Sequence, residues 1–564
     1  MKSRHLAALS VVERALQSRL ADAAQRIGGG TSDVPLVTLP PTRDPSHGDF
    51  ATPVALAAAK MWKCDPMKIA TALAEDHGGG ITGVASLEAA RPGFVNVRMA
   101  PGFWSGVVAE VLDRGDDYGR SDALAATGPV LIEFTSANPT GPLNVVQGRS
   151  GSLGATLVEM FRFAGATTAS ETYVNDAGAQ LDTLAASLYS RYAALFGVDV
   201  PFPEDGYPGD YLIDVAQELR DRDGDKWLRA DPEDRRRALG KFGRDVIVEQ
   251  QRADMERFGV HFDVWFSEAS LHDAGEIDDV VADLKARGFA YEKDGALWLR
   301  TTDSGDDHDR VLRRSDGRPT YLAADAAYHR DKLRRGYKYL INILGPDHHG
   351  YIARLSALVA ALGHPGSIEV LLAQQVTLKR GAETVTMSKR AGNTVTLAEV
   401  MDEVGVDAAR FFFIERAPES HLVFDLALAV EHSQKNPVFY VQYGHARIAS
   451  ILRKAAETGK GALLDRARSA TDVALLGHPT EIALARRLSD FERTVVDAAN
   501  DRAPHRLAEY ARNVAGDFHS FYTDCIVLTD DDALTSARLS LSMAAKTVLA
   551  SSLRILGVSA PDSM

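Results

Sequence analysis

Hydrophobic positions in the first part of the chain have the spacing of a small mixed unit. Apolar residues recur every three to four positions over residues 6–27 and again over 51–62, which predicts two amphipathic helices. Residues 93–98 alternate apolar and polar side chains, as a half-buried strand does. The stretch 113–120 is polar and bears glycine, so we expect a boundary there and a separate α+β domain over residues 1–118.

A strand, a tight loop and a helix follow this boundary. Residues 130–134 form a short apolar run, a Pro- and Gly-rich loop comes next, and helical periodicity runs from about 148 to 163. Two more apolar runs, 339–344 and 367–372, are candidate buried strands. Because strand, loop and helix open a doubly wound sheet, we predict an α/β domain with a Rossmann-type parallel sheet over residues 119–425.

The remaining segments have helical patterns. Residues from about 180 to 300 are rich in charge and helical spacing, and we expect them to form an insertion carried on the α/β domain. Towards the C-terminus, apolar residues recur at helical spacing over 430–452, 480–499, 505–522 and 533–556. An all-α bundle is therefore predicted over residues 426–564.

Composition narrows the class of protein. The 564 residues are 45% hydrophobic and 25% charged, as in a soluble enzyme of roughly three domains. No apolar run reaches the ~20 residues that cross a bilayer, and the first helix lacks the apolar stretch of a signal peptide. The only cysteines, Cys64 and Cys525, are too far apart in sequence to suggest a disulfide framework or a zinc site. We expect a cytoplasmic protein that does not contact a membrane.

The net charge of −14 argues against unspecific binding of nucleic acid. A specific RNA partner stays open, because local patches matter more than the sum. Basic residues cluster at 235–237, 313–314, 330–338 and 447–454. Each cluster taken alone is more often a solvated face that balances nearby acids.

Two segments carry the strongest chemical signals. Residues 136–147, Ser-Ala-Asn-Pro-Thr-Gly-Pro-Leu-Asn-Val-Val-Gln, lie between strand and helix, where backbone amides and a helix N-terminus favour phosphate. This segment resembles the ATP-binding signature of class I aminoacyl-tRNA synthetases, in the form typical of arginyl-tRNA synthetases. Residues 385–397 resemble the second signature loop of that class, whose lysine neutralises the phosphates as diphosphate leaves.

The resemblance extends along the whole chain. Residues 48–52 and 92–96 are similar to the domain that arginyl-tRNA synthetases place against the tRNA elbow, and residues 436–447 are similar to the start of their anticodon-reading bundle. Residues 173–178 and 347–351 match family motifs between them. The resemblance implies a class I synthetase with a small N-terminal domain, a Rossmann-type catalytic domain and an all-α anticodon-binding domain.

The resemblance also implies a role for individual residues. Catalytic roles fall to Asn144, Gln147 and Lys389. ATP binding falls to Pro139, Thr140, Gly141, Pro142, Val146, Gly148, Met387 and Ser388. Arginine binding falls to Glu133, Asn138, Tyr321, Asp325 and His348. Binding of tRNA falls to Phe50, Asn436, Tyr440, Gln442, Tyr443, His445, Arg447 and Met564.

The residues themselves fit arginine. A guanidinium is best held by a carboxylate that pairs with it in bidentate fashion. Asp325 follows Tyr321 by four residues, so one helical turn would place both on one face. The alternative for Tyr321 and Asp325 is a helix N-terminus with a capping acid, which we favour less. His348 and His349 lack a third ligand at metal-binding spacing, so we expect no zinc and no tightly bound cofactor, only Mg²⁺ that accompanies ATP.

The sequence departs from the family pattern in both signature loops and, at Thr523 and Ile526, in the helical domain. Asn144 and Gln147 replace two histidines, Val146 replaces a glycine, and Thr386 replaces the first lysine of the second loop. Two hypotheses follow: a ligase that attaches L-arginine to tRNA(Arg) through arginyl-adenylate, or an impaired relative that binds tRNA or arginine without efficient ligation. The retained pocket residues and Lys389 favour the ligase, with ATP, arginine and tRNA(Arg) as partners and a monomeric chain.

Overall fold

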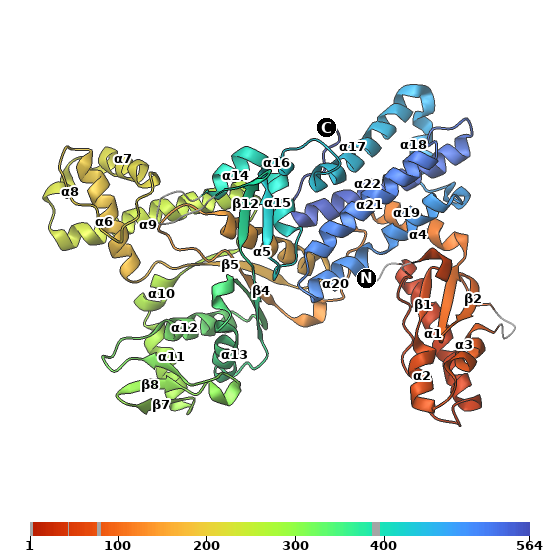
Figure 1. Cartoon of the computed structure of the whole chain (residues 1–564), viewed down its shortest axis with the longest axis horizontal. Helices are drawn as coiled ribbons and strands as arrows, with labels where there is room; N and C mark the ends of the chain where they lie inside the picture. The colour runs from red at the N-terminus through yellow and green to blue at the C-terminus, as the bar shows by residue number, and fades with distance from the viewer. Residues whose placement is uncertain (1–3, 43, 76–79, 386–394) are drawn as a thin grey trace.

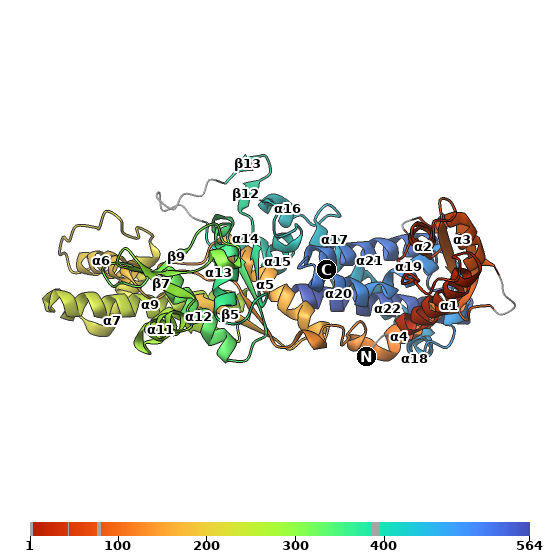
Figure 2. The same ribbon diagram turned by 90° about the horizontal axis from the view of Figure 1, so that it is seen from below.

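The protein is an elongated molecule whose parts follow one another along its long axis (Figure 1 and Figure 2). The computed structural model describes residues 4–42, 44–75, 80–385 and 395–564. The N-terminal unit lies at one end, the C-terminal helices lie in the middle, and a central sheet with two lobes forms the other end.

The N-terminal unit packs three helices on an antiparallel sheet of order β1-β3-β2. Its elements are α1 (Arg4–Arg26), β1 (Phe50–Thr52), α2 (Val54–Trp62), α3 (Pro66–Ala74), β2 (Val84–Ala90) and β3 (Phe94–Met99). The helix expected at 51–62 begins only at Val54, because Ala51 and Thr52 pair with β3. The helix expected over residues 6–27 is α1, and the strand expected over residues 93–98 is β3. A further helix, α4 (Pro101–Arg114), leaves this unit and packs on the C-terminal helices.

The central sheet has five parallel strands in the order β11-β10-β4-β5-β6, which confirms the Rossmann-type prediction. The strands are β4 (Val130–Glu133), β5 (Thr168–Val174), β6 (Val264–Ser267), β10 (Tyr339–Leu344) and β11 (Ile368–Leu372). The crossover from β4 to β5 is α5 (Val145–Phe163). β4 is buried along its whole length, as expected of a middle strand with both faces covered.

The two lobes flank β6, which lies inside the stretch expected to be a single insertion. Before β6 come α6 (Ala179–Ala194), α7 (Tyr211–Asp223), α8 (Lys226–Arg229) and α9 (Pro232–Arg257). After it come α10 (Glu268–Asp273), α11 (Glu276–Ala286), β7 (Ala290–Lys293), β8 (Ala296–Leu299), β9 (Arg310–Arg313) and α12 (Tyr321–Arg334). Figure 1 shows them as separate yellow and green bodies. The charge-rich stretch therefore contributes a strand to the sheet between an all-helical lobe and a mixed one.

A second small sheet, β13-β12-β14, continues from β11. This region contains α13 (Tyr351–Ala361), β12 (Val376–Arg380), β13 (Glu383–Thr384), α14 (Leu397–Val404), α15 (Val406–Ile414), β14 (Leu422–Asp425) and α16 (Leu426–Ala429). Strand β12 runs parallel to β14. β12 packs against α5 and α16, and β14 packs against α15.

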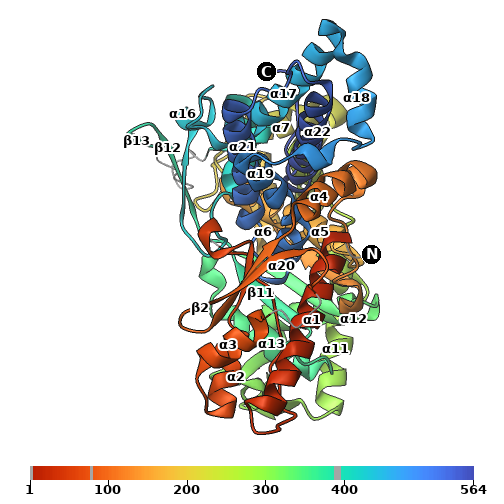
Figure 3. The same ribbon diagram turned by 90° about the vertical axis from the view of Figure 1, so that its right-hand side faces the viewer.

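The C-terminal part is an all-α bundle, as predicted (Figure 3). Its helices are α17 (Pro437–Ala455), α18 (Gly461–Arg468), α19 (Pro479–Ser489), α20 (Phe491–Asn500), α21 (His505–Asp524) and α22 (Asp532–Leu556). The helix expected at 430–452 starts later, because Asn436 caps it and Pro437 occupies its first turn. The helix expected at 480–499 is two helices that meet at Asp490.

α22 alone among the described helices is long and apolar enough to span a membrane by length and composition. However, 78% of its apolar window is buried inside the fold. It packs against α17, α18, α21 and α4. Its composition is that of a central core helix in the bundle.

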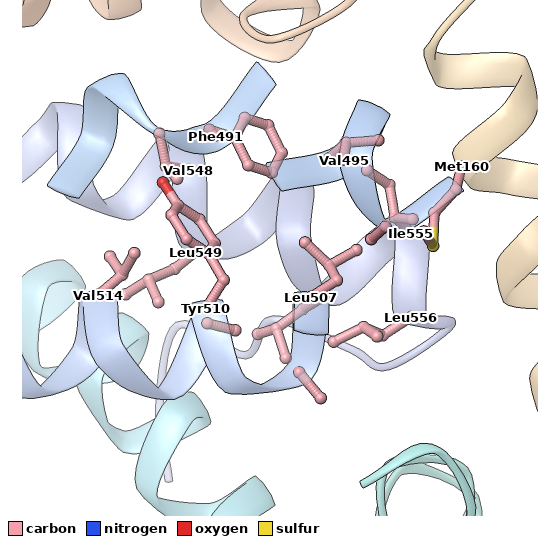
Figure 4. Close-up of a cluster of buried hydrophobic side chains, with 14 of the residues drawn as sticks. Met160, Phe491, Val495, Leu507, Tyr510, Val514, Val548, Leu549, Ile555 and Leu556 are labelled. Atoms are coloured by element: carbon pink, nitrogen blue, oxygen red, sulfur yellow. The ribbon is translucent and has the colours of Figure 1, made fainter. Parts of the chain in front are cut away.

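The bundle and the central sheet share one hydrophobic core (Figure 4). Met160 of α5 lies close to Ile555 of α22, and both are fully buried. Leu507 of α21 and Val495 of α20 belong to the same cluster. Helix α5 therefore has the sheet on one side and the bundle on the other.

A buried guanidinium on α15 links the ends of α9 and α22. Arg410 of α15 is 1% exposed and donates to the carbonyl oxygens of Leu556 (3.1 Å), Phe258 (3.3 Å) and Gly259 (3.0 Å). These carbonyls lie where α22 and α9 end. Burial lowers the pKa of Arg410 to about 10, which leaves the side chain charged at neutral pH.

We predict that Arg410→Met lowers the free energy of unfolding by at least about 2 kcal/mol, because buried carbonyls lose their donors. Urea denaturation of the full chain measures this. Arg416→Met, at an exposed position of the following segment, is the control and should stay within about 0.5 kcal/mol of wild type. Equal stability of the two variants would contradict the assignment of Arg410 as a structural tie.

Candidate active site

The candidate site lies at the carboxyl edge of the central sheet. Here the chain leaves β4 at Glu133, crosses residues 134–144 and enters α5 at Val145. Thr135 has a left-handed backbone with φ of 58°, and its N–H donates to Ser150 Oγ over 3.1 Å. A residue other than glycine holds this conformation only when its surroundings impose it. Ligands of open α/β sheets bind at this edge.

The N-terminus of α5 is closed by a reciprocal capping box. Asn144 Oδ1 accepts a hydrogen bond from the N–H of Val146 at 2.8 Å, and Gln147 Oε1 accepts one from the N–H of Asn144 at 3.1 Å. Since each amide oxygen faces a backbone N–H, each amide NH₂ group points the other way. The helix start therefore adds two neutral donors to the positive end of the α5 dipole, an arrangement suited to phosphate.

The second signature loop is tied to the first at its exit. Thr396 forms a β-bridge with Asn144, and the N–H of Leu397 donates to the carbonyl of Leu143 at 2.8 Å. Thr396 also caps α14 in a capping box of its own with Glu399. The predicted residues Met387, Ser388 and Lys389 lie outside the described residues. The segment that follows them begins directly beside the N-terminus of α5.

A buried arginine ties the entrance of the same loop to α5. Arg149 is fully buried. Its guanidinium donates to the carbonyl oxygens of Gln374 (2.7 Å), Gln375 (3.5 Å), Ala417 (2.9 Å) and Ser420 (2.9 Å). β12 starts after the first pair of these residues and β14 after the second pair. Burial lowers the pKa of Arg149 to about 10, so the guanidinium is still charged at neutral pH.

The loop before α5 is supported by the helical lobe. Gln251 of α9 donates to the carbonyls of Asn138 (3.1 Å) and Gly141 (2.8 Å). Tyr211 of α7 donates to the carbonyl of Thr140. Three carbonyls of the loop backbone, at residues 138, 140 and 141, thus accept hydrogen bonds from the helical lobe.

The other residues predicted to bind ATP surround this loop. Pro139 is buried, Pro142 is exposed and Val146 is half-buried in the first turn of α5. Gly148 faces the interior, where a Cβ would lie 2.7 Å from Leu397 Cδ1. Gly148 therefore allows α14 to approach α5 closely.

A pocket of about 190 Å³ opens beside the sheet edge. Four of the residues predicted to bind arginine line it: Glu133, Tyr321, Asp325 and His348. The fifth, Asn138, lies outside the wall, but its Oδ1 accepts a hydrogen bond from Asn175, which lines the pocket, at 3.2 Å. The structure brings together residues from β4, α12 and the segment after β10.

Sequence reasoning did not assign a role to several residues of this wall. They are Tyr173, Asn175, Glu268, Tyr328, Asn342 and Tyr351. Tyr173 and Asn175 belong to a matched motif at 173–178, so a signal for them existed. Glu268 belongs to no matched motif; its only signal is an acid directly after a four-residue strand.

The pocket is strongly acidic. Burial, together with the charges of Glu133 and Glu268, raises the pKa of Asp325 to about 7. Burial also raises the pKa of Glu268, although Tyr173 and His272 oppose this. Burial acts on Glu133 in the same direction, but the charge and hydrogen bond of Lys332 outweigh it and lower the pKa of Glu133. Among the described residues, neither Asp325 nor Glu268 is in an ion pair with a lysine or arginine, although His272 Nε2 lies 3.7 Å from Glu268 Oε1. A cationic ligand can therefore balance the charge of these two carboxylates.

Metal binding has no support among the residues that the structure describes. No group of three His, Cys, Asp or Glu side chains with a geometry suited to a metal ion occurs in these ranges. His348 packs edge-on against Tyr351 at a ring distance of 5.6 Å.

Three family models match successive parts of the chain. The arginyl tRNA synthetase N terminal domain matches residues 14–99, the catalytic domain of class I (R) tRNA synthetases matches 108–430, and the DALR anticodon binding domain matches 441–564. The arginine–tRNA ligase of Desulforudis audaxviator is 45% identical over 556 residues, which is 98% of each chain. The chain belongs to the arginyl-tRNA synthetase family.

Other members are similar in sequence and structure. The arginine–tRNA ligase of Symbiobacterium thermophilum is 44% identical over 557 residues, 98% of this chain and 99% of its own. A putative arginyl-tRNA synthetase from Campylobacter jejuni has a TM-score of 0.75 at 31% identity and covers 83% of this chain with all of its own. The arginyl-tRNA synthetase of Thermus thermophilus has the same fold, with a TM-score of 0.75 at 24% identity.

The residues that the resemblance assigns to tRNA divide into two groups in the structure. Tyr440, Tyr443 and Arg447 are half-buried on α17, beside His519 and Tyr522 of α21. Their rings and guanidinium form an aromatic face of a kind on which bases stack in RNA-binding proteins. Roles in tRNA binding for these residues stay predictions.

The second group has internal contacts. Asn436 is buried as the cap of α17, Gln442 donates to the carbonyl of Ser559 at 3.0 Å, and His445 bonds to the carbonyl of Pro561 at 2.8 Å. Phe50, on β1, is 3% exposed, whereas Met564 is 57% exposed. Gln442 and His445 hold the C-terminal residues against α17.

The raised pKa of Asp325 makes ligand binding depend on pH. A guanidinium ligand binds the ionised carboxylate, which forms only as the pH rises through about 7. We predict that affinity for free arginine, measured by calorimetry, increases about tenfold from pH 6 to pH 8 and then levels off. Asp325→Asn should bind weakly with a flat profile, and a wild-type affinity that is independent of pH would contradict the assignment.

Proposed function

We propose that this chain attaches L-arginine to tRNA(Arg), using ATP and forming arginyl-adenylate, with release of AMP and diphosphate. The observation that carries the proposal is the acidic pocket beside the capped N-terminus of α5, which gathers the carboxylates of Glu133, Glu268 and Asp325. Among the described residues, Glu133 alone of these three is in an ion pair with a lysine or arginine. Relatives at 45% and 44% identity over nearly the whole chain are named arginine–tRNA ligase, which supports the same activity.

In this proposal the guanidinium and the α-ammonium of arginine contact different residues of the pocket. The guanidinium lies against Asp325 and Glu268, where paired N–H groups meet carboxylate oxygens, with Tyr321 beside them. The α-ammonium lies towards Glu133, at the end of β4. The α-carboxylate then faces the N-terminus of α5. His348 and Asn138 border this space.

ATP lies along the loop before α5, with its phosphates at the helix N-terminus. An oxygen of the arginine carboxylate attacks the α-phosphorus, and the bond to the β-phosphate oxygen breaks as diphosphate leaves. The NH₂ groups of Asn144 and Gln147 donate to the charge that develops on the α-phosphate, and Lys389 neutralises the leaving group. Mg²⁺ enters bound to ATP. The terminal hydroxyl of the tRNA then attacks the carbonyl carbon, and AMP leaves.

The three domains divide the tRNA between them in this proposal. Residues 1–118 take the elbow, residues 119–425 take the acceptor end, and residues 426–564 read the anticodon, in keeping with the family models that match each part. The chain acts as a monomer in the cytoplasm, where its tRNA substrate is found.

We predict that the purified chain transfers labelled arginine to total tRNA in the presence of ATP and Mg²⁺. Asp325→Ala should remove this activity while leaving tRNA affinity, measured by filter binding, within about threefold of wild type, because only the guanidinium loses its partner. If a chain that binds arginine, ATP and tRNA forms no arginyl-tRNA at high enzyme concentration, the ligase proposal is rejected.

The geometry of the capping box allows a substitution to remove the NH₂ donor of Asn144 while it keeps the oxygen that caps α5. Asn144→Asp keeps the oxygen that caps α5 but replaces the NH₂ donor with negative charge. We predict unchanged thermal stability and a fall in adenylate formation of about 100-fold or more, since one donor at a developing anion contributes ~3 kcal/mol. Asn144→Ala is the matched comparison, because it removes both the cap and the donor. A fully active Asn144→Asp variant would show that this amide does not contact the phosphate.

A further inference from the structure

Lys332 is fully buried beneath the arginine pocket. It follows Asp325 by seven residues on α12, so both lie on the same face of the helix. Its Nζ donates to Glu133 Oε2 at 2.6 Å and to Asn342 Oδ1 at 3.3 Å, and it lies 4.1 Å from the centre of the Tyr328 ring. Burial of an ammonium group is costly unless a specific partner compensates it.

The amide and imidazole next to Lys332 are oriented in one way only. Burial lowers the pKa of His329 to about 4, so the ring is neutral. Its Nδ1–H donates to the carbonyl of Asp325 at 2.8 Å, which leaves Nε2 to accept from Asn342 Nδ2 at 3.2 Å. The Oδ1 atom of Asn342 must then face Lys332. The network presents a fixed positive charge to Glu133.

Lys332 gives the carboxylates of Glu133 and Asp325 different capacities to accept hydrogen bonds from a ligand. Glu133 Oε2 accepts from Lys332, and Glu133 Oε1 accepts from Ser136 Oγ at 2.9 Å. Both oxygens are already used once, so Glu133 cannot offer a free bidentate edge to a guanidinium, but each retains a lone pair for a single N–H. The Asp325 carboxylate has no hydrogen-bond partner among the described side chains that line the pocket, and both of its oxygens stay open.

The charges around Glu133 come from several elements. α12 contributes Lys332, Asp325 and neutral His329, and α10 contributes Glu268. β10 contributes only the uncharged Asn342. Lys332 is the one cation among the described residues that contacts Glu133 directly.

We propose that Lys332 is a positioning residue that commits Glu133 to the α-ammonium of arginine and leaves Asp325 and Glu268 to the guanidinium. This inference rests on the proposed function. It makes Lys332 responsible for the orientation of arginine, with its carboxylate towards the α5 N-terminus, although Lys332 does not touch the substrate.

The test compares two ligands that differ at one end. Calorimetry at pH 7 measures binding of arginine and of 5-guanidinopentanoic acid, which lacks only the α-ammonium. We expect Lys332→Met to lower the affinity for arginine at least about tenfold and the affinity for the analogue less than about threefold. The reason is that the variant disturbs the hydrogen bond between Glu133 and the charged α-ammonium, a group that the analogue lacks. Lys338→Met, at an exposed position after α12, should change neither ligand.

Two further variants separate the outcomes. Glu133→Gln should lose the preference for arginine over the analogue to the same extent as Lys332→Met. The double variant Lys332→Met/Glu133→Gln leaves neither charge buried alone, so its loss of arginine affinity should be no larger than that of Glu133→Gln. Equal weakening of both ligands by Lys332→Met, or additive losses in the double variant, would overturn the inference. Failure of the wild-type chain to bind arginine would instead reject the proposed function.

Discussion

The interaction on which the site depends is the buried contact of Arg149 with four backbone carbonyls. A guanidinium removed from water is stable only when its donors find acceptors, and here the acceptors are the residues that open β12 and β14. Because Arg149 belongs to the first turns of α5, the strands that frame the second signature loop keep a fixed place relative to the capped helix N-terminus. The β-bridge from Thr396 to Asn144 fixes the other end.

Much of the fold could be predicted from the sequence because its determining patterns are local. The apolar runs of β4 and β10 and the helical spacing of α21 and α22 each lie within one element. β6 escaped prediction because it has four half-buried residues inside a charged, helix-rich stretch, and its place in the sheet comes from pairing with β5. The break at Asp490 was likewise missed, because apolar residues keep helical spacing on both sides of it.

The site was predictable to a smaller extent. Motif resemblance pointed to Glu133, Tyr321, Asp325 and His348, which the fold gathers from distant segments into one pocket. It gave no sign of Glu268, nor that Glu133 is paired with Lys332. Those facts depend on which side chains meet after folding. The replacements at Asn144 and Gln147 suggested weakened catalysis, but the capping box uses their oxygens and leaves both NH₂ groups available.

The core shared by α5 and the bundle has a consequence for dissecting the protein. Met160 and Ile555 lie in a single cluster that includes residues from the catalytic sheet and from α20, α21 and α22. A fragment that stops after β14 would expose this apolar surface to solvent, and exposed patches of that kind promote aggregation. The catalytic part is therefore not an autonomous module. Loss of activity in a truncated form would reflect its aggregation and not the chemistry of the site.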